Sequence, residues 1–198
     1  MTRRVVLATG NSGKVKEMSG LLAEFGFEVL PQSEFDVPEA EETGLTFVEN
    51  AIIKARNAAA HTGLPAIADD SGLEVDYLKG APGIYSSRFA GPEASSQTNL
   101  DKLLTDMKGV SDAERSARFQ CLLVFMEHEK DPTPVICQGT WEGRILHERT
   151  GENGFGYDPV FYVPTHDCAS AELPSEIKRQ ISHRGQALHQ FAEVMKTT

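Results

Sequence analysis

Residues 5–26 have the sequence VVLATGNSGKVKEMSGLLAEFG, and this stretch decides the fold. Val5 to Ala8 form a short apolar run that ends in the small and polar residues Thr9, Gly10 and Asn11, which predicts a buried strand. From Val15 onward apolar residues recur at helical spacing until Gly26. The stretch therefore predicts a strand, a tight turn and a helix, which is the first half of a βαβ unit.

Further elements follow in an order that predicts an α/β protein. We expect strands at 27–30, 66–68, 73–78, 118–126, 135–146 and 160–163, and helices at 46–61, 100–107 and 188–195, with a loop at 31–45. The loop ends in Thr46-Phe47-Val48-Glu49, the pattern of a capping box. The fold class predicted is α/β, with a mixed central β-sheet flanked by helices. We find no repeat and no long linker, so residues 1–198 are expected to form a single domain.

Composition restricts the possible partners. The 198 residues contain 40% hydrophobic and 24% charged residues, as in ordinary globular proteins. The net charge of −10 repels a polyanion, so no nucleic acid partner is expected. A small phosphorylated ligand remains possible, because a few lysines and a metal ion can neutralise it locally.

The cysteines and the apolar segments indicate a compartment. Cys121, Cys137 and Cys168 lie far apart without zinc-ligand spacing, which favours reduced thiols. No stretch approaches the roughly 20 apolar residues of a membrane span, and the apolar run at 5–8 is too short for a signal peptide. We expect a cytoplasmic protein with no membrane partner.

The turn TGNSGK at 9–14 is the first candidate site. A helix that follows a strand directs its unpaired N–H groups and the positive end of its dipole at the turn, and Lys14 adds a full charge. This geometry suits phosphate. The run is not a Walker A motif, because Gly10 is too close to Gly13-Lys14 and Val15 replaces Ser or Thr. A plain strand-to-helix turn with an exposed lysine is the alternative.

A pair of carboxylates follows the apolar run at 66–68. Asp69 and Asp70 are expected at the carboxyl end of that strand, where ligands bind in open α/β sheets. Neighbouring strand residues point to opposite faces, so one of the two would face a given cleft unless the strand has already ended. That carboxylate could hold Mg²⁺ or take a proton from water. The alternative is an Asp-Ser-Gly turn that bonds backbone amides.

Acidic residues also precede the helix at 46–61. Glu39, Glu41 and Glu42 lie in the loop, and Lys54 lies two turns into the helix. A carboxylate from this loop would complete a Mg²⁺ site, which usually takes one or two protein ligands. Solvated acids and an exposed lysine are the alternative.

The second half of the chain supplies groups suited to a purine base. Phe155-Gly156-Tyr157-Asp158 provides an aromatic ring for stacking, a glycine for close approach and an acceptor carboxylate. Lys178 and Ser182-His183-Arg184 add donors that suit carbonyl oxygens on a purine, and Ser182 could cap the last helix. The alternative is a turn that packs its aromatic rings into the core.

Together these runs resemble the Ham1-type inosine triphosphate pyrophosphatases. That family has TGNxxK near the N-terminus, an acidic loop before a lysine-bearing helix, ADDSGL, GFGYDP and a closing SHRG, and this chain has them in order between Val5 and Phe191. The resemblance implies two lobes with an active-site cleft between them. It also implies a Mg²⁺-dependent homodimer that hydrolyses dITP, ITP and XTP to the monophosphate and pyrophosphate.

The resemblance also implies roles for individual residues. The triphosphate would be held by Thr9, Gly10, Asn11, Ser12, Gly13, Lys14 and Lys54. Glu42 and Asp70 would hold Mg²⁺, with Asp70 also acting as the base, and Ser71 would contact substrate. The base pocket would comprise Phe155, Gly156, Tyr157, Asp158, Lys178, His183 and Arg184.

Two other functions are to be separated from this one. A Maf-like nucleotide pyrophosphatase acting on modified pyrimidines is disfavoured by the SHRG and FGYDP runs, and a nucleotide-sensing module would bind without turnover.

Donors at residues 183–184 would pair with a 6-keto oxygen and oppose the amino group of adenine, so ITP, dITP and XTP are expected to be used far better than ATP. Guanine shares the 6-keto group, so its rejection is expected to come from its 2-amino group near FGYDP.

Overall fold

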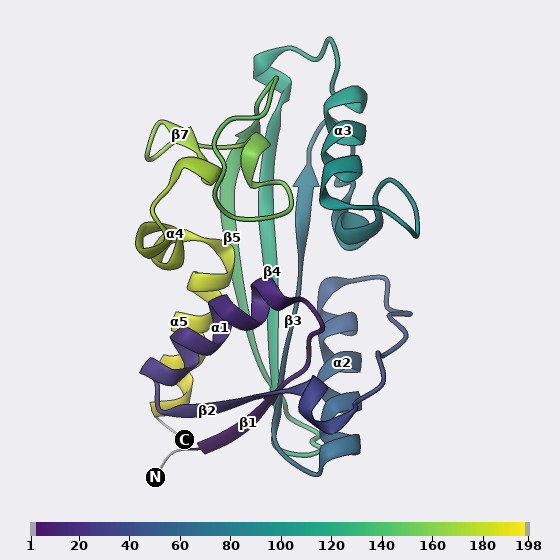
Figure 1. The fold of residues 1–198 in the computed structure, drawn as a ribbon, viewed down its shortest axis with the longest axis vertical. Helices are drawn as coiled ribbons and strands as arrows, with labels where there is room; N and C mark the ends of the chain where they lie inside the picture. Colours follow the sequence, from purple (N-terminus) through teal and green to yellow (C-terminus); the bar gives the residue numbers. More distant parts are fainter. Residues whose placement is uncertain (1–2, 197–198) are drawn as a thin grey trace. The chain divides into compact units, whose positions relative to one another are not determined.

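The computed structural model describes residues 3–196 and contains a seven-stranded sheet (Figure 1). The strand order is β2-β1-β3-β4-β5-β6-β7. The strands are β1 Arg3–Leu7, β2 Phe27–Pro31, β3 Ala66–Val75, β4 Ser116–Met126, β5 Val135–Ile145, β6 Phe161–Val163 and β7 Cys168–Ala169. The helices are α1 Ser12–Glu24, α2 Phe47–Thr62, α3 Ser96–Asp106, α4 Ser175–Ile181 and α5 His183–Lys196. Because β1 pairs in parallel with β2 and β3, while β6 pairs antiparallel with β5 and β7, the sheet is mixed. The predicted α/β class is confirmed.

The N-terminal βαβ unit forms as the sequence predicts. Val5 of β1 lies opposite Val29 of β2, and Val6 lies opposite Ala66 of β3. Helix α1 begins at Ser12, three residues before its first apolar position, because the Asn11 side chain caps it. This cap fixes the turn between β1 and α1.

The described chain separates into two compact units. The first comprises the residues up to Asp70, then Cys121–Gly139, and the residues from Gln186 onward; the second comprises Ser71–Gln120 and Thr140–Gly185. Strands β3, β4 and β5 each contribute residues to both units. Neither unit is therefore a continuous segment of chain.

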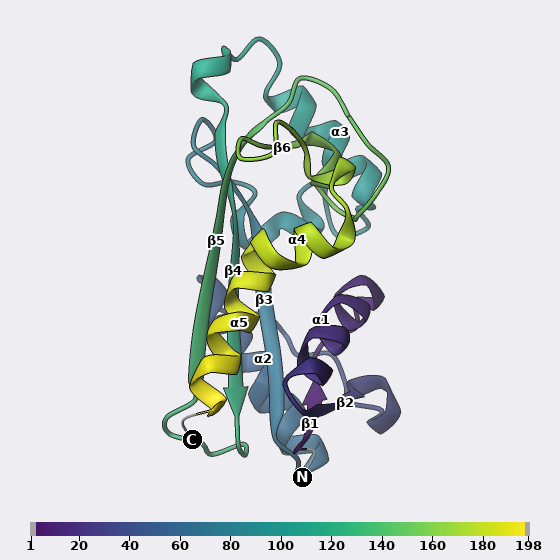
Figure 2. The same ribbon diagram turned by 90° about the vertical axis from the view of Figure 1, so that its left-hand side faces the viewer.

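The first unit buries both faces of its part of the sheet. Met18, Leu21 and Leu22 of α1 pack with Leu188 and Phe191 of α5 in one apolar cluster. A second cluster joins β1, β3 and β4 to α2 through the small residues Ala51, Ala55, Ala58 and Ala59. Figures 1 and 2 show α1 and α5 on one face and α2 on the other. Alanines at helical spacing let α2 approach the sheet closely.

The second unit has its own core. Leu100, Leu103 and Met107 of the α3 segment pack with residues of β3 to β6, including Trp141 and Phe161. Ser95 and Thr98 form a capping box at the start of α3. Arg115 is buried beside this core, and its guanidinium donates to the backbone oxygens of Met107, Val110, Ile145 and Leu146. These bonds satisfy a charge that burial would otherwise penalise.

Two differences from the sequence expectations concern elements that carry candidate site residues. Helix α4 was not predicted, because its seven residues are too few to show a helical repeat. Strand β3 is continuous from Ala66 to Val75, where a break at Asp69-Asp70-Ser71-Gly72 was expected. No helix within residues 3–196 combines the length and the apolar character needed to cross a bilayer.

Candidate functional site: paired carboxylates and lysines, and an aromatic turn with donors

The turn at 9–14 has the geometry of an anion site. Asn11 Oδ1 accepts the backbone N–H of Lys14 at 3.1 Å, and Thr9 Oγ1 accepts that of Asn11 at 3.1 Å. The first turn of α1 contains no acidic residue. Since the first N–H groups of a helix have no acceptor within it, Ser12 and Gly13 direct donors and the positive dipole end outward. The turn can bind phosphate.

Asp69 and Asp70 lie inside β3, so their predicted position at the end of a strand is wrong. The reason is that β3 continues through Leu73 and Val75, which are fully buried and keep the strand regular. The predicted alternation of faces does apply. Asp69 Oδ2 lies 2.9 Å from Lys14 Nζ of α1, whereas Asp70 Oδ1 lies 2.8 Å from Lys54 Nζ of α2. Each aspartate therefore has a lysine from a helix on its own side of the sheet.

Lys54 also joins Asp70 to the acidic loop. Its Nζ lies 3.1 Å from Glu42 Oε1, and its side chain is only 14% exposed. Burial lowers the pKa of Lys54, but Asp70, Asp69 and Glu42 outweigh this effect and hold the net pKa above its ordinary value. Burial raises the pKa of Asp70, and Lys54 offsets that rise only in part. The exposed, solvated lysine that was the alternative at this position is excluded.

The carboxylates of Glu42 and Asp70 fit a magnesium ion. Asp70 Oδ2 is buried and accepts no hydrogen bond from the described residues, so it has an unused lone pair. The other oxygen of the same carboxylate, Oδ1, and Glu42 Oε1 both contact Lys54 Nζ. Within residues 3–196 no set of three or more His, Cys, Asp or Glu side chains could hold a metal. Mg²⁺ does not need three, because it usually keeps several waters and takes one or two carboxylates.

The loop that carries Glu42 is fixed by the capping box at Thr46 and Glu49 and by Asn50, a residue that was not predicted. Asn50 is fully buried, and its Oδ1 accepts the backbone N–H of Gly44 at 2.8 Å. The Glu49 carboxylate accepts from Leu45 N at 2.9 Å and from the Thr46 hydroxyl at 2.7 Å. A fully buried amide one helical turn before Lys54 could have been noticed from spacing, but a sequence alone does not show its burial.

The second unit contains the aromatic turn at 155–158. Phe155 is 39% exposed, whereas Tyr157 is a core residue whose hydroxyl donates to Ser86 O at 2.7 Å. Burial raises the pKa of the Tyr157 hydroxyl. Because the Tyr157 side chain lies in the core, only the backbone of Tyr157 could make the predicted contact with a base. Gly156 has a φ of +63°, which reverses the chain between the two rings.

The last donors lie near Phe155 in the same unit. The Arg184 guanidinium donates to Ser71 Oγ at 3.1 Å and lies 5.8 Å from the centre of the Phe155 ring. His183 stacks on Phe119, with ring centres 4.8 Å apart and an angle of 11°. Phe119 and Trp141 were not predicted, because single aromatic residues on strands look like ordinary core. Ser182 Oγ accepts the backbone N–H of Gly185, as a cap of α5 would.

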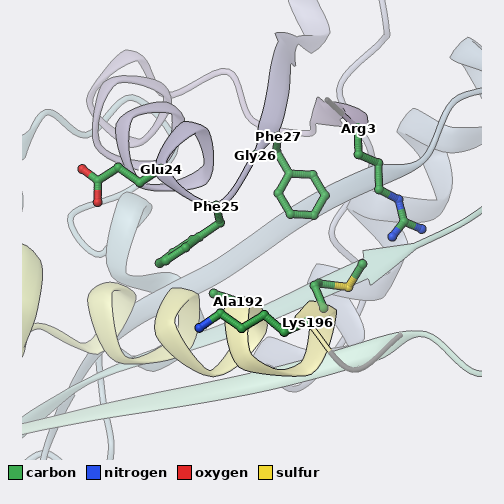
Figure 3. Close-up of a pocket in the computed structure, with 8 residues that line it drawn as sticks. Arg3, Glu24, Phe25, Gly26, Phe27, Ala192 and Lys196 are labelled. Atoms are coloured by element: carbon green, nitrogen blue, oxygen red, sulfur yellow. The ribbon is translucent and has the colours of Figure 1, made fainter. Parts of the chain in front are cut away.

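A separate hollow in the first unit contains none of the predicted site residues. It has a volume of about 360 Å³ and is lined by Arg3, Glu24, Phe25, Gly26, Phe27, Ala192, Met195 and Lys196. Figure 3 shows Phe25 and Phe27 beside the end of α5, with Lys196 on that helix. The carboxylates, lysines and aromatic turn described above do not line this hollow.

The fold is that of an α/β protein, and its paired carboxylates and lysines are groups that suit a phosphorylated ligand. The family model of the Ham1 family matches residues 5–194. The chain is 67% identical to a dITP/XTP pyrophosphatase of Vibrio parahaemolyticus, over 99% of this chain and 98% of the relative. It is 57% identical to a dITP/XTP pyrophosphatase of Escherichia coli O157:H7, over 98% of both chains. A solved HAM1 protein from Coxiella burnetii superposes with a TM-score of 0.92 at 52% identity, covering 99% of this chain and all of the other. The chain belongs to the Ham1 family.

Proposed function

We propose that this chain is a nucleoside-triphosphate pyrophosphatase that hydrolyses dITP, ITP and XTP to the monophosphate and pyrophosphate. Its relatives bear the name dITP/XTP pyrophosphatase over nearly its whole length, and the enzyme class is that of hydrolases acting on acid anhydrides. The observation that best supports the proposal is the pair of neighbouring carboxylates, Asp69 and Asp70, each held by its own lysine.

The residues of the first unit suit attack at the α-phosphorus. Asp70 would accept a proton as water attacks the α-phosphorus, and the bond to the bridging oxygen of the β-phosphate would break. Lys14 and Lys54, with the N–H groups at the start of α1, would bind the phosphate oxygens and offset the charge that develops on pyrophosphate. A Mg²⁺ ion held by Glu42 and Asp70 would supply further charge compensation on the leaving group.

The residues of the second unit suit a keto purine. The exposed Phe155 ring offers a stacking surface, and Arg184 and Lys178 are cationic donors beside it. Arg184 and His183 are assigned to the 6-keto oxygen. A site built around such hydrogen bonds rejects an amino group at that position by several decades, because its donors are left unpaired.

The test is pyrophosphate release from ITP, dITP, XTP, ATP and GTP, each with and without Mg²⁺. We expect kcat/KM for the first three to exceed that for ATP and GTP by at least about 100-fold, and activity to require the metal. Comparable kcat/KM for ATP and ITP would refute the base assignment. Binding of ITP without pyrophosphate release would identify a sensing module instead of an enzyme.

A further inference from the structure

The Asp158 carboxylate is occupied by donors of the protein itself. It is 3% exposed, its Oδ2 accepts from Phe155 N at 2.8 Å and from Lys178 Nζ at 2.5 Å, and its Oδ1 accepts from Ser170 Oγ at 2.8 Å. A side chain at Gly154 would overlap Oδ2, so the turn closes directly over the carboxylate. Asp158 therefore does not stand free as an acceptor for a base, which was its expected role.

Lys178 lies where a stacked purine would meet it. Its Nζ is 5.5 Å from the centre of the Phe155 ring, and Arg184 lies 5.8 Å from the same ring. Both cations are largely buried, with 14% of the Lys178 side chain and 2% of Arg184 exposed. A base stacked on Phe155 thus has two fixed cations at its edge. With Arg184 assigned to the 6-keto oxygen, we assign Lys178 to the other substituted position of the pairing edge, C2, which lies beyond N1.

We propose, on the basis of the function proposed above, that Lys178 determines which substituent is accepted at purine C2. An ammonium group has three donors and no acceptor, and one donor of Lys178 is used by Asp158. The 2-keto oxygen of xanthine would accept from another. The 2-amino group of guanine would meet donor against donor, and the hydrogen of hypoxanthine would make neither contact.

The ion pair adds a second effect against guanine. A free carboxylate beside the pairing edge would accept from both N1–H and the 2-amino group of guanine, since an ionised carboxylate only accepts. By engaging Oδ2, Lys178 withholds Asp158 from that contact. One lysine therefore accounts for use of XTP, use of ITP and rejection of GTP.

The decisive variant is Lys178→Ala, assayed for pyrophosphate release from ITP, XTP and GTP. We expect the ratio of kcat/KM for XTP to that for ITP to fall at least about tenfold, and the ratio for GTP to ITP to rise by a similar factor. A lysine that only supports the turn would lower all three values together. Unchanged ratios would overturn the proposal.

Two further variants separate the causes. In Lys178→Ala/Asp158→Asn the carboxylate is gone, so the ratio for GTP to ITP should rise less than in Lys178→Ala, while XTP stays poor. An equal rise in both variants contradicts the role of Asp158. Lys130→Ala removes the same charge from a side chain that is 85% exposed and should leave every ratio unchanged. If Lys178→Ala does not fold, Lys178→Met tests the same ratios, because Met keeps most of the length of the side chain and has no N–H donor.

Equilibrium binding gives a readout that does not depend on turnover. Calorimetric titration of wild type and Lys178→Ala with XMP, IMP and GMP should reproduce the two changes in ratio. If wild type releases no pyrophosphate from ITP, the proposed function fails. If wild type prefers ITP and XTP but the variant keeps the same ratios, the proposed function stands and the inference about Lys178 is wrong.

Discussion

Two adjacent aspartates can serve different purposes because a strand directs them to opposite faces. Asp69 is held by Lys14 and Asp70 by Lys54, and Asp70 alone shares its lysine with Glu42. The buried Oδ2 of Asp70 accepts no hydrogen bond from the described residues, which suits a group that water or a metal approaches. We therefore assign the base to Asp70 and the positioning of Lys14 to Asp69.

The first prediction at this scale concerns Asp70→Asn. The amide keeps the shape of the side chain but cannot accept a proton, so kcat should fall by far more than tenfold while the fold is retained. Steady-state kinetics and circular dichroism would measure both. Asp69→Asn is the matched control, and it should raise KM through Lys14 with a smaller effect on kcat. More than about a tenth of wild-type kcat in Asp70→Asn, a loss under ~1.4 kcal/mol, would show that Asp70 is not the base.

The same substitution has a pH-dependent effect on stability. Burial raises the pKa of Asp70, so the folded state binds the proton more tightly than the unfolded state, and ionised Asp70 costs stability. That cost is present above the raised pKa and is lost as pH falls toward the ordinary value of about 4. Asp70→Asn should therefore melt at or above the wild-type temperature near pH 7, with the difference shrinking at acidic pH. A scanning calorimetry series in which the difference grows on acidification would contradict this sign.

At the scale of elements, the acidic loop depends on the first turns of α2. A Cβ on Gly44 would lie 2.6 Å from Glu49 Cβ and 2.7 Å from Asn50 Oδ1, and Asn50 holds the backbone of Gly44. The hydrogen bond to Asn50 and the close approach to Glu49 fix the backbone at Gly44, two residues after Glu42. The position of the proposed metal ligand therefore depends on close packing between a loop and a helix.

We predict that Gly44→Ala displaces this loop. Overpacking should lower the free energy of unfolding by about 1–3 kcal/mol and raise the Mg²⁺ concentration needed for half-maximal activity. Urea denaturation and a metal titration of activity measure the two effects. Ala40→Gly, in the same loop, is the control for added backbone freedom and should leave the metal requirement closer to wild type. Unchanged metal dependence in Gly44→Ala would show that the loop can adjust without moving Glu42.

Local signals predicted the elements that depend on local chemistry. Thr46 and Gly26 mark helix ends through a cap and a positive φ, and both lie where the sequence places them, whereas the cap at Asn11 was not predicted. The continuity of β3 could not be predicted, because Asp-Ser-Gly favours a turn locally while lateral pairing in the sheet keeps the strand extended. The engagement of Asp158 by Ser170 is equally hidden, since the two residues are twelve positions apart and meet only in the folded unit.

At the scale of the whole molecule, the net charge of −10 contrasts with the local arrangement of cations. Lys14, Lys54, Lys178 and Arg184 all lie with more than four-fifths of the side chain or residue buried. Each is held by a carboxylate or a hydroxyl, so the chain keeps a few positive groups in fixed positions while its overall charge repels polyanions. This distribution favours a small triphosphate over nucleic acid.

The final prediction is that the chain forms a homodimer, which we propose from its family resemblance. Large apolar side chains left exposed on the described chain, including Leu45 at 81%, Tyr77 at 51% and Tyr85 at 53%, are consistent with surface that a partner could cover. In a two-fold pair the same residues of both copies would form the interface. Light scattering at micromolar concentration should therefore give twice the 21.6 kDa of one chain. A single-chain mass across a dilution series from tens of micromolar downward would contradict the dimer and leave the assignment of Asp70 untouched, because Asp70, Lys54 and Glu42 all belong to one chain.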